Sequence, residues 1–136
     1  MEYISTRNKN LSFNFKEIFL RGLAPDGGLF IPKKIKRYNG EEIKKLSDLR
    51  YIDLATEILF NFCSSYFEKN KLRNLIEKSY KNFNTKEVIK IKKFGDLNLV
   101  ELYHGPTLAF KDIAMQVLGN IYDEINISSD KKVNII

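Results

Sequence analysis

The 136 residues of the chain are enough for one ordinary domain, or for two small units that share a core. Hydrophobic residues make up 43% and charged residues 29%, and no long apolar run occurs, so the sequence predicts a globular protein without a transmembrane helix or an N-terminal secretory signal. The net charge is +6, but the lysines are scattered rather than gathered on one face among aromatic residues, so we expect neither a nucleic-acid partner nor a membrane partner.

The few cysteine and histidine side chains exclude two kinds of site. Cys63 is the one cysteine, which rules out an internal disulfide framework and fits a reducing, cytoplasmic location. It ends an apolar pattern, so we expect a buried small hydrophobe. His104 is the one histidine, and no cysteine or acidic cluster repeats at ligand spacing, so no metal site is predicted.

A capping box begins the first predicted helix. Asn14 can accept a hydrogen bond from the helix start, and Glu17 stands three residues later, as the motif requires. The helix can continue only to Arg21, because Gly22 suits a left-handed C-terminal cap.

Short strands and a glycine-rich turn surround this helix. The segment Tyr3-Ile-Ser-Thr6 reads as one strand and Leu29-Phe-Ile31 as another, which Pro32 should end. Between them, Pro25-Asp-Gly-Gly28 predicts a turn, whose glycines serve backbone geometry rather than ligand contact.

Residues 41–83 have a helical pattern that divides into two apolar faces. Such faces are core, and no function is assigned to them. The first face comprises Tyr51, Leu54, Ala55, Ile58, Leu59 and Phe62, and the second comprises Leu72, Leu75, Ile76 and Phe83.

Residues 88–94 and 97–103 read as two strands, and Gly95-Asp96 between them predicts a two-residue hairpin turn. Gly105-Pro106 then ends regular structure, and a helix is predicted from Asp112 to about Asn126. Its expected apolar face consists of Ala114, Val117, Leu118, Ile121 and Ile125.

Lys111 lies at an unusual place, on the connection between a strand and the first turn of this helix. A helix start carries partial positive charge, so it favours acids such as Asp112, which we expect to be a first-turn acid rather than a catalyst. A lysine beside Phe110 and an apolar loop should lose some of its preference for protonation. Lower basicity is what an amine needs to attack a carbonyl and form a Schiff base.

The end of the chain adds a polar loop at residues 128–132 and a strand at residues 133–136. The predicted fold class is α/β: a helix-rich N-terminal region with short strands, then a β-hairpin, then the opening βαβ unit of a larger, incomplete, mostly parallel sheet. The unpaired edge at residues 133–136 favours a homodimer or strand exchange.

Three segments in order resemble one enzyme family. They are Tyr3-Ile-Ser-Thr-Arg7, Gly22-Leu-Ala-Pro-Asp-Gly-Gly-Leu-Phe-Ile-Pro32 and His104-Gly-Pro-Thr-Leu-Ala-Phe-Lys-Asp112. The first resembles the usual opening of threonine synthases, the second their N-terminal signature, and the third the segment with their cofactor lysine. Related enzymes of the same tryptophan-synthase-beta-like fold place their lysine in different surroundings.

The resemblance implies a pyridoxal-phosphate-dependent lyase of threonine biosynthesis, which converts O-phospho-L-homoserine and water into L-threonine and phosphate. It implies that Lys111 holds the cofactor covalently and moves protons at the substrate. Phe110 is a candidate wall of the cofactor site, and it is equally well explained as a core aromatic before the helix. His104, Thr107 and Arg7 are candidate substrate residues, and His104 is equally well explained as a histidine that satisfies backbone groups at the turn.

The resemblance also implies a division into an N-terminal domain, residues 1–84, and the start of a catalytic domain, residues 85–136. In the family, the next strand leads into a glycine- and serine/threonine-rich loop that binds the cofactor phosphate. That loop is not in this sequence, so we expect the chain to be the N-terminal part of a longer cytoplasmic enzyme, inactive by itself.

Two alternatives stay open. A threonine-synthase-like phospholyase shares these motifs and releases phosphate and a keto acid instead of threonine. A folding or binding module without cofactor chemistry would not need Lys111 for activity.

Overall fold

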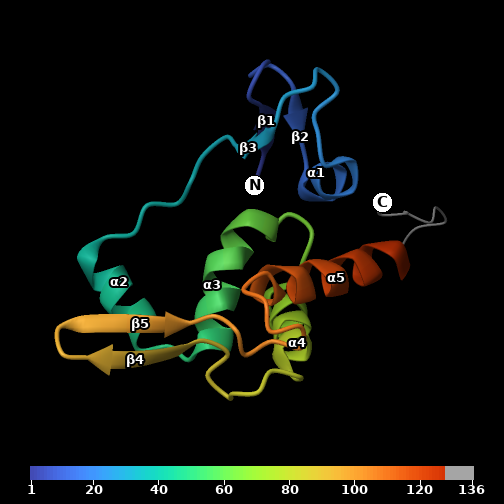
Figure 1. Cartoon of the computed structure of the whole chain (residues 1–136). Coiled ribbons are helices and arrows are strands. Elements are labelled where there is room, and N and C mark those ends of the chain that lie inside the picture. Colours follow the sequence, from blue (N-terminus) through green and yellow to red (C-terminus); the bar gives the residue numbers. More distant parts are fainter. Residues whose placement is uncertain (128–136) are drawn as a thin grey trace.

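The computed structural model describes residues 1–127, which form helices and two small antiparallel sheets (Figure 1). The predicted α/β class is confirmed, as are the helix-rich N-terminal region and the hairpin. The strand expected at residues 133–136, and with it the βαβ unit and its edge, lies outside the described residues. The elements in chain order are β1 (Tyr3–Ser5), β2 (Ser12–Phe13), α1 (Phe15–Arg21), β3 (Phe30–Pro32), α2 (Gly40–Ser47), α3 (Tyr51–Cys63), α4 (Lys69–Tyr80), β4 (Lys90–Phe94), β5 (Leu97–Glu101) and α5 (Asp112–Ile127).

The N-terminal sheet has the strand order β2-β1-β3, with Tyr3 opposite both Phe13 and Pro32. Pro32 therefore belongs to β3 rather than stopping the strand before it, which corrects the sequence-based boundary. Proline is tolerated there because β3 is an edge strand. The sheet sits on the helices through the Tyr3 hydroxyl, which donates to the Phe62 carbonyl oxygen at 2.5 Å.

Helix α1 has the predicted limits. The Asn14 side chain accepts from the Glu17 N–H and the Glu17 carboxylate accepts from the Asn14 N–H, which completes the capping box. Gly22 follows with φ 72°, a conformation that glycine adopts without steric cost. Phe15 and Phe19 on this helix pack on Phe67 and Tyr122, so α1 is part of the same core as the longer helices.

The helical stretch after residue 40 forms three helices where the sequence suggested two. Asn39 supplies a second capping box with Glu42 and starts the separate helix α2, which has no buried residue. Phe83, expected on the second helical face, lies beyond the end of α4, and its ring packs edge-on against Tyr80 at 5.1 Å.

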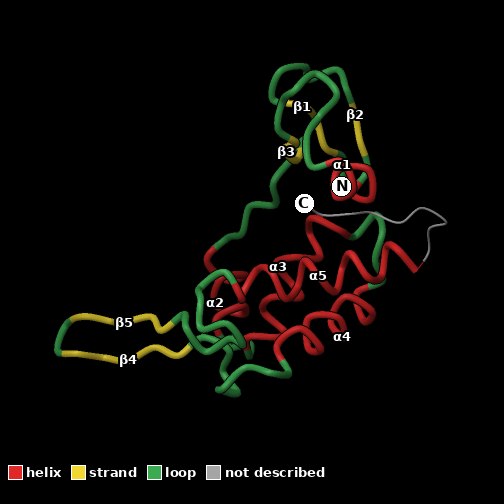
Figure 2. The backbone as a smooth tube through the Cα atoms, turned by 45° about the vertical axis from the view of Figure 1, so that its right-hand side comes forward, coloured by secondary structure: helices red, strands yellow, loops and turns green. Residues whose placement is uncertain are grey.

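Helices α3, α4 and α5 pack together as a bundle, with α4 in contact with both of the others (Figure 2). Leu72 and Ile76 of α4 and Ile125 of α5 are fully buried between them. Cys63 is buried at the end of α3, as expected, and burial raises the pKa of its thiol to about 11.

The apolar face expected on α5 is only partly buried. Val117, Ile121 and Ile125 enter the core, whereas Ala114 and Leu118 are exposed. These two residues border an almost wholly apolar cleft of about 590 Å³ between α5 and α3. The helix therefore has a wider apolar surface than α4 alone covers.

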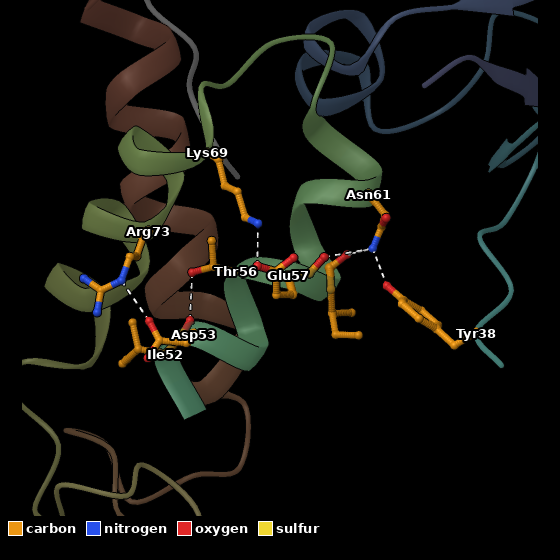
Figure 3. Close-up of polar contacts among 9 residues, drawn as sticks. Tyr38, Ile52, Asp53, Thr56, Glu57, Asn61, Lys69 and Arg73 are labelled. Atoms are coloured by element: carbon orange, nitrogen blue, oxygen red, sulfur yellow. Dashed lines mark hydrogen bonds and ion pairs between the residues drawn. The ribbon is translucent and has the colours of Figure 1, made fainter. Parts of the chain in front are cut away.

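The polar side of α3 is occupied by ion pairs with α4 (Figure 3). Asp53 accepts from Arg73 Nε at 2.9 Å, and Glu57 pairs with Lys69 one turn further along. Within α3, the Thr56 hydroxyl donates a hydrogen bond to the Ile52 carbonyl oxygen at 2.7 Å. Because these charged groups hold α3 and α4 together, we assign them a structural role and no catalytic one.

The hairpin β4–β5 projects away from the helices in both views (Figures 1 and 2). Its register pairs Phe94 with Leu97 around the predicted turn, and Gly95 has the positive φ of 56° that the turn requires. Both strands are shorter than predicted. Val88, expected in the first strand, has φ 61°, which a β-branched residue in a strand does not adopt.

Candidate active site

The connection from β5 to α5, residues 102–111, carries the predicted lysine and is attached to the end of α4. The backbone N–H of Asn84 donates to the His104 carbonyl oxygen at 2.8 Å. The Tyr80 hydroxyl donates to the Ile113 carbonyl oxygen at 2.8 Å, in the first turn of α5. Burial raises the pKa of Tyr80 above its usual range, so this hydroxyl keeps its proton. The connection is thus held at its start and just beyond its end.

Asp112 fixes the shape of the connection. Its two carboxylate oxygens accept from the Thr107 N–H and the Thr107 hydroxyl, each at 2.8 Å. Burial alone would raise the pKa of Asp112, but the hydrogen bonds from Thr107, together with those from Gln116 and the Ala109 backbone, outweigh it and the pKa is lowered. The carboxyl is 3% exposed and fully engaged, as expected of a structural first-turn acid.

Gly105 leaves the room that Asp112 needs. A Cβ atom on Gly105 would lie 2.4 Å from both Cβ and Oδ2 of Asp112. Leu108, next to Thr107, has φ 61°, a conformation that L residues rarely adopt. The backbone here is therefore bent tightly around one carboxylate. Residue 105 must be a glycine because a side chain there would overlap Asp112.

Glu101 was not identified from the sequence, although it lies near the predicted site and is as deeply buried as Asp112. It is 3% exposed, accepts from His104 Nε2 at 2.8 Å, and pairs with Lys92 Nζ at 2.5 Å. The hydrogen bond from Lys92, opposed by burial and supported by the one from His104, lowers the pKa of Glu101 to about 2. The available signal was a single acid within the apolar run Leu99-Val-Glu-Leu102.

Lys111 is the last residue of this connection, and its side chain is exposed. The neighbouring Phe110 is 64% exposed. The described residues do not supply the apolar enclosure that was expected to affect this lysine. They do place a primary amine at the first turn of α5, open to a small molecule. Of the predicted site residues, the structure gathers His104, Thr107, Phe110 and Lys111 on this one connection.

Arg7 lies elsewhere, in the bend that directly follows β1 of the N-terminal sheet, and both views show that sheet apart from the start of α5 (Figures 1 and 2). Its Nη1 donates to the Asp26 carbonyl oxygen at 3.1 Å, and its backbone N–H donates to Ser5 Oγ at 3.1 Å. The residue joins the first resemblance segment to the second.

Asp26 and the glycines of the Pro25-Asp-Gly-Gly28 turn complete that junction. Ser5 Oγ donates to Asp26 Oδ1 at 2.7 Å, and Gly28 N–H donates to the same oxygen at 2.9 Å. These two bonds lower the pKa of Asp26. A Cβ on Gly28 would lie 2.2 Å from Ser5 Oγ, so the turn serves backbone geometry, as predicted.

The described residues contain neither a membrane-spanning helix nor a cluster of metal ligands. Within residues 1–127, no helix combines the length and apolarity needed to cross a membrane. The same 127 residues contain no group of three or more histidine, cysteine, aspartate or glutamate side chains placed to hold a metal ion.

Comparison with known proteins gives a consistent result. Residues 2–80 match the family model described as the threonine synthase N terminus. Threonine synthase of Schizosaccharomyces pombe is 38% identical over 125 residues, which is 90% of this chain and 24% of that protein. Threonine synthase-like 2 of Xenopus laevis is 33% identical over 100% of this chain and 29% of its own length.

A solved structure has the same fold. The PLP-bound threonine synthase from Brucella melitensis superposes with a TM-score of 0.88 and 32% identity, covering 94% of this chain and 28% of the other. The chain thus spans about a quarter of the length of the proteins it matches.

Proposed function

The chain belongs to the threonine synthase family, and on this premise we propose that it is the N-terminal part of an enzyme that converts O-phospho-L-homoserine and water into L-threonine and phosphate. The observation that supports this most strongly is the connection before α5. Its backbone is fixed by Asp112, whereas the Lys111 side chain at its end is exposed. An exposed amine on a rigid support suits covalent attachment of an aldehyde cofactor.

Pyridoxal phosphate, when bound, would supply the electron sink for this reaction, and the chain's own residues would bind and orient it. The described residues fit the aldehyde end of the cofactor, because Lys111 offers an accessible primary amine and Phe110 an exposed ring next to it. In this proposal Lys111 would hold the cofactor through its side-chain amine and Phe110 would flank it.

The proton transfers are assigned to this same connection. The Lys111 amine is the proposed group for moving protons at the α and β carbons of the substrate. Thr107 gives both its donors to Asp112, so we propose that it holds the connection in place beside the substrate. His104 is half-buried on the same connection and is proposed as a substrate residue. A substrate role for Arg7 stays a prediction, since its guanidinium is bound to the Asp26 carbonyl oxygen.

The remaining expectations are part of the same proposal. We propose an N-terminal domain of residues 1–84 and the start of a catalytic domain at residues 85–136, in a cytoplasmic enzyme of threonine biosynthesis. The 136-residue chain alone is proposed to be inactive, and the homodimer or strand exchange expected from the sequence stays a prediction. Limited proteolysis of the chain tests the division, which predicts first cleavage near residue 84.

The second candidate is a phospholyase that releases a keto acid. The match to threonine synthase-like 2 over 100% of this chain keeps it in consideration, because the motifs alone do not separate the two reactions. Both reactions liberate phosphate from the same substrate, so phosphate release by itself does not discriminate between them.

Product analysis on the intact protein that contains this chain tests the proposal. With O-phospho-L-homoserine and pyridoxal phosphate, we expect equal amounts of threonine and phosphate. Lys111→Ala should abolish both, while Lys93→Ala, a change of an exposed lysine on β4, should leave the rate unchanged. Keto acid without threonine would establish the phospholyase instead, and full activity of Lys111→Ala would leave only the non-catalytic module.

A further inference from the structure

The carboxylate of Glu101 joins the hairpin to the connection that carries Lys111. Glu101 ends β5, and its partner in the register is Lys90. Its side chain instead reaches diagonally to Lys92 Nζ on β4, at 2.5 Å, and forward to His104 Nε2, at 2.8 Å. A carboxylate that is 3% exposed is thus shared between a strand lysine and the one histidine of the chain, and it also accepts from the Tyr103 hydroxyl.

The protonation of Glu101 determines which nitrogen of His104 carries a proton. An ionised carboxylate has only acceptors, so His104 Nε2 must be the donor in their hydrogen bond. The lowered pKa of Glu101, about 2, keeps it ionised at neutral pH. In a neutral imidazole with a proton on Nε2, the other nitrogen, Nδ1, is an acceptor.

The surroundings of His104 hold the ring in this orientation. The Tyr103 ring lies against it with centroids 4.8 Å apart, and the backbone oxygen of His104 is bonded to the Asn84 N–H at 2.8 Å. Glu87 is the other acid close enough to interact with the imidazole electrostatically. Its carboxylate accepts a hydrogen bond from the Thr85 hydroxyl at 2.5 Å. No hydrogen bond to Nδ1 is made by any residue in the described part of the chain.

We propose that Glu101 is a positioning residue, which fixes His104 as the Nε2–H tautomer and so presents Nδ1 as a hydrogen-bond acceptor on the connection that carries Lys111. The chemical class that fits this acceptor is a neutral O–H donor, either water or the hydroxyl of the threonine product. Only the identity of that donor rests on the proposed function, because the tautomer follows from the Glu101–His104 contact alone.

Nitrogen-15 NMR of the 136-residue chain, labelled in histidine, tests this directly. His104 is the one histidine, so its two ring nitrogens need no further assignment. At a pH where the imidazole is neutral, the wild-type chain should show a protonated Nε2 and an unprotonated Nδ1. The Nε2 proton should also exchange slowly with water, because it is held by a buried carboxylate.

Glu101→Gln should lower the ratio of Nε2–H to Nδ1–H by about tenfold, since it removes a charged acceptor. Lys92→Met is the matched control, because it breaks the other ion pair of Glu101 and leaves the His104 contact in place. We expect this control to keep the wild-type tautomer.

A wild-type signal for Nδ1–H would overturn the proposal whether or not any variant folds. An unchanged ratio in a folded Glu101→Gln chain would do the same. Neither outcome bears on whether Lys111 binds a cofactor, so failure of this inference is distinguishable from failure of the proposed function.

Discussion

Asp112 and Thr107 are joined by two hydrogen bonds of 2.8 Å each, one to each carboxylate oxygen. These two hydrogen bonds close a loop of six residues, from Thr107 to Asp112, at the point where α5 begins. Gly105 lies against the same carboxylate, with no space for a side chain. Residues of one short segment thus determine its shape by contacting each other, and Lys111 is carried at its end.

The first prediction concerns the Thr107 hydroxyl. Thr107→Val should lower the free energy of unfolding by about 1 kcal/mol, because it leaves one oxygen of a buried carboxylate without its partner. Thr107→Ser keeps the hydroxyl and should remain within about 0.5 kcal/mol of the wild type. Urea denaturation followed by circular dichroism measures both, and equal values for the two variants would contradict this account of the loop.

The second prediction compares two glycines. Gly105→Ala should destabilise the chain by about 1–3 kcal/mol, since its Cβ would overlap Asp112 and the neighbouring backbone must shift. Gly119→Ala should stabilise it by up to about 1 kcal/mol, because Gly119 lies inside α5 with nothing within 4 Å of a new Cβ. Thermal unfolding of both variants should therefore give shifts of opposite sign. A harmless Gly105→Ala would mean that Asp112 does not occupy the position described.

The third prediction is the pH dependence that comes from Glu101. Its pKa falls from 4.5 to about 2 in the folded chain, with the Lys92 hydrogen bond as the largest cause. Since the folded-state value is the lower one, this group stabilises the fold above pH 4.5, and the contribution is lost as the pH falls from 4.5 to about 2.

Glu101→Gln should therefore flatten the fall in unfolding free energy across this pH window. Glu41→Gln, a change of an exposed acid in α2, should keep the wild-type slope. Denaturation curves at successive pH values provide the comparison, and equal slopes in all three chains would show that the Glu101 carboxylate is not held as described.

The features predicted well from the sequence are those set by residues close together in the chain. The capping box of Asn14 and Glu17 needs only a three-residue spacing, and the hairpin turn at Gly95-Asp96 depends on conformations that local residues determine. Lys111 was likewise placed correctly between a strand and a helix, because Gly105-Pro106 ends one pattern and the next begins at Asp112.

What was missed depends on contacts between distant residues. Ser5 and Asp26 are hydrogen-bonded across 21 residues, and Arg7, two residues after Ser5, donates to the Asp26 carbonyl oxygen. Glu101 was missed because its role depends on an ion pair with Lys92 on the neighbouring strand. The periodicity of the sequence does not reveal such a cross-strand contact. The exposure of Ala114 and Leu118 was missed for the same reason. The apolar pattern of a helix face does not indicate which neighbouring element covers it.

Lys111 is the amine that the proposed function requires to bind pyridoxal phosphate. The direct measurement incubates the 136-residue chain with pyridoxal phosphate, reduces it with borohydride, and maps the modified peptides against a sample without cofactor. We predict a single stoichiometric adduct on Lys111, which Lys111→Arg removes without increasing labelling elsewhere. Partial labelling scattered over the exposed lysines, with Lys111 no more reactive than Lys92 or Lys93, would contradict the account.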